Sequence, residues 1–186
     1  MKLSGLTKKK NNYVTYANKG LLLEEDINIT NVYYRNTDRA LIYKKPTPIK
    51  IVKVVYPNSK TSKITEAFFE KPSTLDYCGI YKSCYLDFDA KECNSKTSFP
   101  LSNIHKHQLE HIRRVLKLGG ISFIIVRFNL LGKNYVLFGN ELLEFIDNND
   151  RKSIPYEYFM EKGYLVELKY SPRLDYLDAI DLYLSK

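Results

Sequence analysis

The sequence predicts a mixed α/β protein in which helices flank a central sheet. The first observation is the run Ile121–Val126, which is apolar at nearly every position, as in a central strand buried on both faces. The second is helical periodicity at residues 21–32 and 102–117. The third is a pair of lysine-bearing, strand-like segments at residues 49–55 and 63–69, which predicts a β-hairpin with lysines on its exposed face.

The N-terminal region divides into a basic arm and the start of a folded domain. Residues 1–20 carry five lysines, no acidic residue and no periodicity, which predicts a flexible arm. The chain of 186 residues is long enough for one domain with a hydrophobic core, which we expect to span residues 21–186. Its first helix is expected to bury a face made of Leu22, Leu23, Ile27 and Val32.

A large insertion follows the first predicted strand at residues 39–44. The segment Lys44-Lys45-Pro46-Thr47-Pro48 must interrupt regular structure, because proline lacks an N–H donor and has a fixed φ. The two lysine-bearing strands come next. Since this hairpin is too large for a compact core, we expect residues 45–71, called the stalk from here on, to project from the domain.

The second half of the chain predicts the rest of the sheet and its covering helices. Ser102 is expected to cap a helix that runs to about Lys117 and ends at Gly119-Gly120. The remaining expected elements are a strand at 134–138 beside the central strand, helices near 140–147 and 155–161, a strand at 165–168 and a terminal helix at 175–184.

Acidic residues and a lysine follow the stalk at positions suited to phosphodiester chemistry. Asp89 and Lys91 alternate along a strand-like segment, so their side chains project from one face. With Asp76, this set fits a magnesium-dependent phosphodiesterase, in which carboxylates hold the cation and an ammonium group lies beside the phosphate. Asp87 lies on the same face, and its role as a ligand, a supporting group or a surface charge stays open.

A hairpin would bring the two acids together. With residues 82–83 as a two-residue turn, Tyr81 pairs with Cys84, and the same register places Asp76 opposite Asp89. Directly opposed Cβ atoms lie about 4.5–5.5 Å apart, and two carboxylates that close repel unless a cation lies between them. The alternative is ordinary charge decoration of a solvated strand.

The positive charge lies outside the acidic segment. The chain has a net charge of +8, and residues 44–71 carry seven lysines against two glutamates. This separation suits a polyanion that one surface holds and another cuts, while the alternative is a generally basic surface that keeps the protein in solution. The candidate DNA contacts are Lys8, Lys9, Lys10, Lys44, Lys45, Lys50, Lys53, Lys60 and Lys63.

Other features narrow the class of protein. No apolar run approaches the roughly 18 residues of a membrane span, and no signal-peptide core follows Met1, so we expect a cytoplasmic protein with no membrane partner. Cys78, Cys84 and Cys93 are odd in number and match no zinc pattern, which predicts reduced strand residues. A mixed Cys/His metal site is the alternative.

A series of sequence blocks, in order and spread over nearly all of the chain after the arm, forms a distinct pattern. The blocks are Asn18-Lys19-Gly20, Leu23-Glu24-Glu25-Asp26, Lys44-Lys45-Pro46-Thr47-Pro48, Ser73-Thr74-Leu75-Asp76-Tyr77, Asp87-Phe88-Asp89-Ala90-Lys91-Glu92, Lys96-Thr97-Ser98-Phe99-Pro100-Leu101, His107-Gln108-Leu109-Glu110-His111 and Ser171-Pro172-Arg173-Leu174-Asp175-Tyr176. Together they resemble the RecU family of Holliday junction resolvases. The resemblance implies a restriction-endonuclease-like nuclease core with a projecting stalk.

The resemblance also implies roles for individual residues. Thr74, Asp76, Asp89 and Gln108 match the family's Mg²⁺ positions, with Mn²⁺ as a substitute, and Asp76, Asp89 and Lys91 match its catalytic positions. Lys91 is the implied stabiliser of the transition state. Asp89 departs from the family pattern, which usually has the longer glutamate there.

The implied activity is paired cutting of four-way DNA junctions by a homodimer during recombination and DNA repair, with contacts to recombinase and branch-migration proteins. Two alternatives share these residues. One is a nuclease that acts on linear duplex DNA. The other is a non-catalytic protein that binds junctions or modulates the recombinase.

Overall fold

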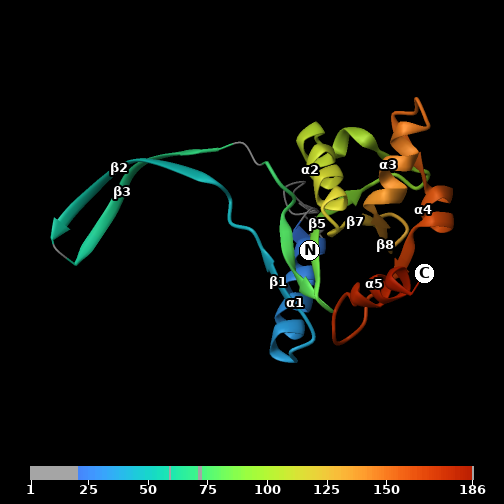
Figure 1. The fold of residues 1–186 in the computed structure, drawn as a ribbon, viewed down its shortest axis with the longest axis horizontal. Helices are drawn as coiled ribbons and strands as arrows, with labels where there is room; N and C mark the ends of the chain where they lie inside the picture. The colour runs from blue at the N-terminus through green and yellow to red at the C-terminus, as the bar shows by residue number, and fades with distance from the viewer. Residues whose placement is uncertain (1–20, 59, 71–72, 186) are drawn as a thin grey trace, which may run out of the picture.

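The computed structural model describes residues 21–58, 60–70 and 73–185, and a six-stranded mixed sheet forms its centre (Figure 1). Every neighbouring pair of strands is antiparallel except β5 and β7, which are parallel. In spatial order the strands are β1 (Leu41–Lys44), β4 (Tyr77–Tyr81), β5 (Cys84–Cys93), β7 (Ile121–Phe128), β8 (Lys133–Phe138) and β10 (Tyr164–Val166).

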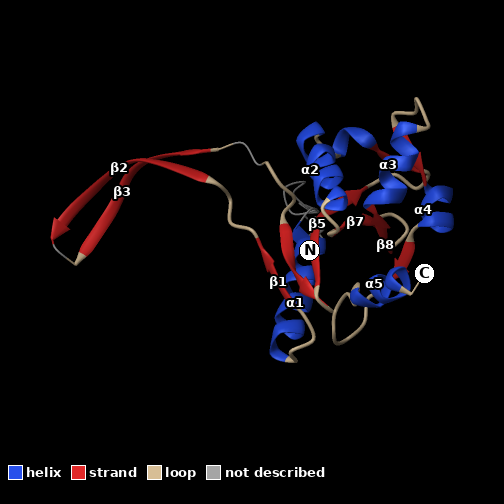
Figure 2. Cartoon of the chain, viewed as in Figure 1, coloured by secondary structure: helices blue, strands red, loops and turns tan. Residues whose placement is uncertain are grey.

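Helices cover both faces of this sheet (Figure 2). One face carries α1 (Leu21–Asn36) and α5 (Leu177–Leu184), and the other carries α2 (Lys106–Lys117), α3 (Gly139–Asp147) and α4 (Tyr156–Lys162). The predicted central strand β7 is buried along its whole length, and its alternate residues join the two hydrophobic clusters. The predicted mixed sheet flanked by helices is therefore confirmed.

The stalk is a two-stranded sheet that projects from the core (Figure 1). Its strands are β2 (Ile49–Asn58) and β3 (Thr61–Phe69), and side chains along both are largely exposed. The projecting hairpin is thus confirmed. The basic arm predicted at residues 1–20 lies outside the described residues.

Helix α1 buries a face different from the one its leucines suggest. Leu23 and Ile27 are buried as expected, but Leu22 and Val32 are 60% and 45% exposed. Two polar residues, Thr30 and Asn31, are buried further along the helix because each accepts a hydrogen bond from the segment that precedes α5. Thr30 accepts the Leu174 N–H, and Asn31 accepts the Tyr176 hydroxyl. Tertiary hydrogen bonds therefore decide which side of the helix faces the core.

The connection into α2 also differs from expectation. A 3₁₀ turn, Leu101–Asn103, occupies the place where Ser102 was expected to cap the helix, and α2 begins four residues later. Two short strands that the sequence did not predict, β6 (Ser98–Pro100) and β9 (Ser153–Pro155), pair with each other. They bury Phe99 and Ile154 in the cluster beneath α2, α3 and α4. None of the helices in the described part of the chain is long and apolar enough to cross a membrane.

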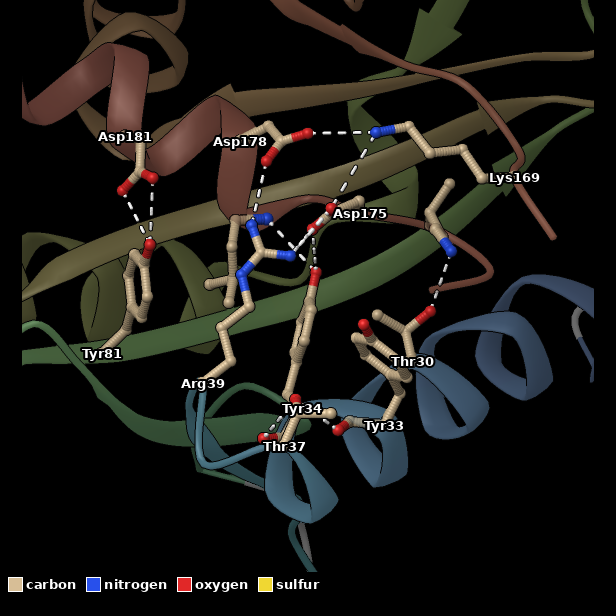
Figure 3. Close-up of polar contacts among 12 residues, drawn as sticks. Thr30, Tyr33, Tyr34, Thr37, Arg39, Tyr81, Lys169, Asp175, Asp178 and Asp181 are labelled. Atoms are coloured by element: carbon tan, nitrogen blue, oxygen red, sulfur yellow. Dashed lines mark hydrogen bonds and ion pairs between the residues drawn. The ribbon is translucent and has the colours of Figure 1, made fainter. Parts of the chain in front are cut away.

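A network of ion pairs centred on the buried Asp175 ties α1 to the C-terminal segment (Figure 3). Asp175 accepts the Tyr34 hydroxyl at 2.7 Å and pairs with Arg39 at 2.8 Å. Arg39 also bonds Asp178, which in turn pairs with Lys169. Asp175 is buried whereas Asp178 is half exposed, so loss of the Asp175 carboxylate is expected to destabilise the fold more.

We expect Asp175→Ala to lower the free energy of unfolding by about 3 kcal/mol, because it removes the acceptor of the buried Tyr34 hydroxyl and the more buried of the two carboxylates that pair with Arg39. Asp178→Ala is the matched control, since it removes a more exposed partner of Arg39 and is expected to cost less than about 1 kcal/mol. Urea denaturation of both variants measures the difference. Equal losses would show that burial of Asp175 is not what matters.

Candidate active site

The β4–β5 hairpin has the predicted register. Tyr81 pairs with Cys84 and Tyr77 pairs with Phe88. The two turn residues between the strands have φ values of 46° and 64°, as in a tight hairpin turn with two left-handed residues. One further step of the same register places Asp76 opposite Asp89, as predicted.

The side chains of β5 alternate between the two faces of the sheet. Leu86 and Phe88 enter the core beneath α1 and α5. Asp87, Asp89 and Lys91 lie on the other face, where Asp89 contacts α2. The strand thus has one hydrophobic face and one face that carries the candidate chemistry.

Asp89 is the most deeply buried of the proposed metal ligands, with 1% of its surface exposed. Its Oδ1 accepts the Ala90 N–H at 2.8 Å, and its Oδ2 lies 3.0 Å from Lys91 Nζ. Burial raises the pKa of Asp89, and the Asp76 carboxylate raises it further, while the Lys91 ammonium opposes both effects. A second positive charge is therefore electrostatically favourable here, and a divalent cation would supply it.

Gln108 reaches the same carboxylate from the first turn of α2. Its Oε1 accepts the His105 N–H at 3.0 Å, and its Nε2 donates to Asp89 Oδ2. The backbone donor fixes the orientation of the amide, because only its oxygen can accept that hydrogen bond. The sequence places Gln108 on α2, but only the tertiary structure brings it to Asp89.

Thr74 and Asp76 lie at the base of the stalk. Both are partly exposed and line a groove of about 410 Å³ with Lys44, Lys45 and the prolines that follow. The Thr74 hydroxyl donates to the Leu75 carbonyl at 3.2 Å, which leaves its oxygen able to accept or to bind a cation. The groove therefore opens the candidate metal ligands to solvent from the stalk side.

The donor set fits a magnesium-type ion. Asp76 and Asp89 offer hard carboxylate oxygens, and Mg²⁺ is commonly held by one or two carboxylates with water completing the shell. Within the described residues there is no cluster of three or more His, Cys, Asp or Glu side chains. All three cysteines are free, so the alternative of a mixed Cys/His site has no support in the described part of the chain.

Asp87 is fully buried and surrounded by protein groups, a setting that the sequence left open. Its Oδ2 lies 2.7 Å from Lys45 Nζ and accepts the Tyr85 hydroxyl at 2.6 Å. Its Oδ1 lies 3.2 Å from His111 Nε2. The period of two along β5 indicated that Asp87 shares the face of Asp89, but no local signal indicated Lys45 as its partner.

The candidate DNA-contacting lysines fall into distinct environments. Lys44 pairs with Glu24 at 2.5 Å and Lys45 with Asp87, whereas Lys8, Lys9 and Lys10 lie outside the described residues. The remaining four are exposed on the stalk: Lys50, Lys53, Lys60 and Lys63. The exposed stalk lysines are therefore the ones whose ammonium groups are accessible to a phosphate backbone.

Comparisons with known proteins converge on one family. Residues 18–182 match the family described as RecU, Recombination protein U. A protein of Geobacillus sp. (strain WCH70) named Holliday junction resolvase RecU is 47% identical over 169 residues, which cover 89% of this chain and 84% of that protein. A protein of Leuconostoc mesenteroides with the same name is 46% identical over 179 residues, which cover 96% of this chain and 86% of that protein.

A solved structure of Hjc, a Holliday junction resolvase from Archaeoglobus fulgidus, is similar with a TM-score of 0.45 and 9% sequence identity. The match covers 78% of this chain and 90% of that one.

We expect Asp89→Asn to raise the stability of the metal-free protein at neutral pH. The folded-state pKa of Asp89 is raised, so the charged carboxylate destabilises the fold, and protonation as the pH falls relieves this cost. The neutral amide mimics the protonated state at every pH. Urea denaturation in the presence of a chelator tests this, and a less stable variant would contradict it.

The same pair of proteins tests metal binding. Mg²⁺ should raise the melting temperature of the wild type and leave that of Asp89→Asn almost unchanged, because a ligand stabilises only the state that binds it. An equal rise in melting temperature in both proteins would show that the cation does not bind at Asp89.

Proposed function

The chain belongs to the RecU family, and we propose that it is a metal-dependent endonuclease that resolves Holliday junctions by hydrolysing DNA phosphodiester bonds. The observation that carries the proposal is the opposition of Asp76 and buried Asp89 beside Lys91. Two carboxylates and one ammonium group lie near the base of a basic stalk. This arrangement suits a polyanionic substrate that is attacked at a phosphorus atom.

The proposed ion is Mg²⁺, with Mn²⁺ as a substitute. Asp76 and Asp89 would hold it through carboxylate oxygens, and the Thr74 hydroxyl oxygen would add a neutral donor. The Gln108 amide oxygen keeps one lone pair free after accepting the His105 N–H, and through it Gln108 would contribute to the shell of the ion. Such an ion lowers the pKa of coordinated water and stabilises the negative charge that develops on the phosphate.

Lys91 has a separate role in the proposal. Its ammonium group lies 3.0 Å from Asp89 Oδ2 and is mostly shielded from solvent. With a cation bound to Asp89, the Lys91 ammonium would be available to the phosphate oxygens. A positive charge at that position favours the transition state, which carries more negative charge on those oxygens than the substrate does.

Aspartate at position 89 is one methylene shorter than the glutamate expected from the family. The direct bond from Gln108 Nε2 and the position of Asp89 on a buried strand hold its carboxylate firmly in place. We propose that this carboxylate would hold the ion despite its shorter side chain, and that activity is retained.

Symmetric resolution of a junction requires two active sites, so we propose that the working form is a homodimer. The proposed partner is four-way junction DNA, and recombinase and branch-migration proteins are further candidates. A substrate of this kind favours the cytoplasmic location expected from the sequence.

We expect the wild type to cut a synthetic four-way junction in Mg²⁺, and Asp76→Asn to bind the junction without cutting it, because the variant keeps the stalk and loses a metal ligand. Gel analysis of labelled junctions measures both steps. Linear duplex of matched sequence is the control substrate. Equal cutting of the duplex would favour a duplex nuclease, and junction binding without cutting by the wild type would favour a non-catalytic junction-binding protein.

We expect the triple variant Lys50→Met, Lys53→Met and Lys63→Met to weaken junction binding and reduce its dependence on salt. Each lysine that contacts a phosphate contributes about 0.9 to the slope of log affinity against log salt. Lys162→Met, on α4 across the core from the stalk, is the matched control (Figure 1). Titrations at several salt concentrations measure the slopes, and an unchanged slope in the triple variant would remove these lysines from the DNA contact.

A further inference from the structure

We propose that Lys45 and Asp87 form a positioning pair that fixes the base of the stalk against the catalytic strands and thereby sets the location of Asp76. The inference deepens the proposed function and rests on it. Asp87 has no exposed surface, and its partner comes from a segment 42 residues earlier in the chain. The buried Asp87 carboxylate cannot exchange this contact for water, and Lys45 is only partly exposed, so the pair links β5 to the segment that leads into the stalk.

Lys45 makes two contacts at once. Its side chain reaches Asp87 Oδ2 at 2.7 Å, and its backbone N–H donates to the Asp76 carbonyl at 2.7 Å. One residue therefore touches the backbone of a proposed metal ligand and a carboxylate two positions from another. A displacement of Lys45 would move Asp76 relative to Asp89.

Asp87 is bonded by two residues and approached by a third, His111, whose Nε2 lies 3.2 Å from Asp87 Oδ1 without a hydrogen bond between them. Lys45 approaches from the stalk base, Tyr85 from β5 itself and His111 from α2. Gln108 lies one turn before His111 on the same helix and bonds Asp89. Helix α2 thus contacts both Asp87 and Asp89, and Asp87 also pairs with Lys45 at the base of the stalk.

The pairing argues against two simpler roles. As a metal ligand, Asp87 would have to give up Lys45, which already neutralises it. As a DNA contact, Lys45 would have to leave a fully buried carboxylate without a counter-charge, which is strongly unfavourable. Lys45 thereby differs from the exposed stalk lysines.

The test uses Lys45→Met and the conservative Lys45→Arg, with Lys82→Met as the matched control. Lys82 is also paired with an aspartate and lies in the turn of the β4–β5 hairpin, outside the proposed site. Three quantities are measured for each protein: Mn²⁺ bound in the absence of DNA, junction affinity in non-cleaving Ca²⁺, and the single-turnover cleavage rate at saturating junction. Urea denaturation reports the stability of each variant.

We expect Lys45→Met to lower Mn²⁺ affinity and the saturated cleavage rate by about 10- to 100-fold, as for other residues that orient metal ligands, with little change in junction affinity. Lys45→Arg should recover most of both losses, and Lys82→Met should match the wild type. A mainly reduced junction affinity with a normal rate at saturation would overturn the proposal and make Lys45 a DNA contact.

Asp87→Asn provides an independent second variant. Its effect on Mn²⁺ affinity and cleavage should not add to that of Lys45→Met, because both remove one interaction. Additive effects would also overturn the proposal. Failure of the wild type to cut junctions would refute the proposed function alone, since Mn²⁺ binding by the variants would still decide whether the pair positions the site.

Discussion

The register between β4 and β5 is the constraint on which the site depends. Rings stack across three neighbouring strands, with centroid distances of 4.9 Å between Tyr77 and Phe88 and 4.6 Å between Phe88 and Phe123. These stacked pairs lie on the face opposite the acids, so a shift of one residue would exchange the two faces of β5. The core beneath α1 and α5 thereby determines that Asp89 faces α2 and Asp76.

Asp87 and Asp89 are both buried carboxylates on β5, but the charges around them differ. Asp87 pairs with Lys45 and accepts the Tyr85 hydroxyl through one oxygen, while its other oxygen lies 3.2 Å from His111 Nε2. Asp89 shares its surroundings with Asp76, and its pKa is raised by burial despite Lys91. The strand therefore combines a structural carboxylate with one whose charge is poorly compensated by the protein, and only the second has the properties expected of a metal ligand.

The basic and acidic segments that the sequence keeps apart also lie in different parts of the fold. The stalk projects from the core (Figure 1) and carries exposed lysines, while Asp76 lies beside the segment that leads into the stalk. The groove lined by Thr74 and Asp76 opens at this junction. A DNA strand held by the stalk would therefore reach the proposed ligands without crossing the hydrophobic core.

The sequence by itself determined the elements whose signals are local. The continuous apolar run gave β7, the period of two placed Asp89 and Lys91 on one face of β5, and the two-residue spacing gave the hairpin turn. The family blocks supplied Thr74 and Gln108, which periodicity alone would not have selected as ligands.

Only the tertiary structure decided the contacts that join distant segments. The pairing of Lys45 with Asp87, the bond from Gln108 to Asp89 and the polar buried face of α1 each depend on partners at least 19 residues away. A repeating pattern indicates which side of an element is buried but not which residue it meets there, because that choice is made when complete elements pack together.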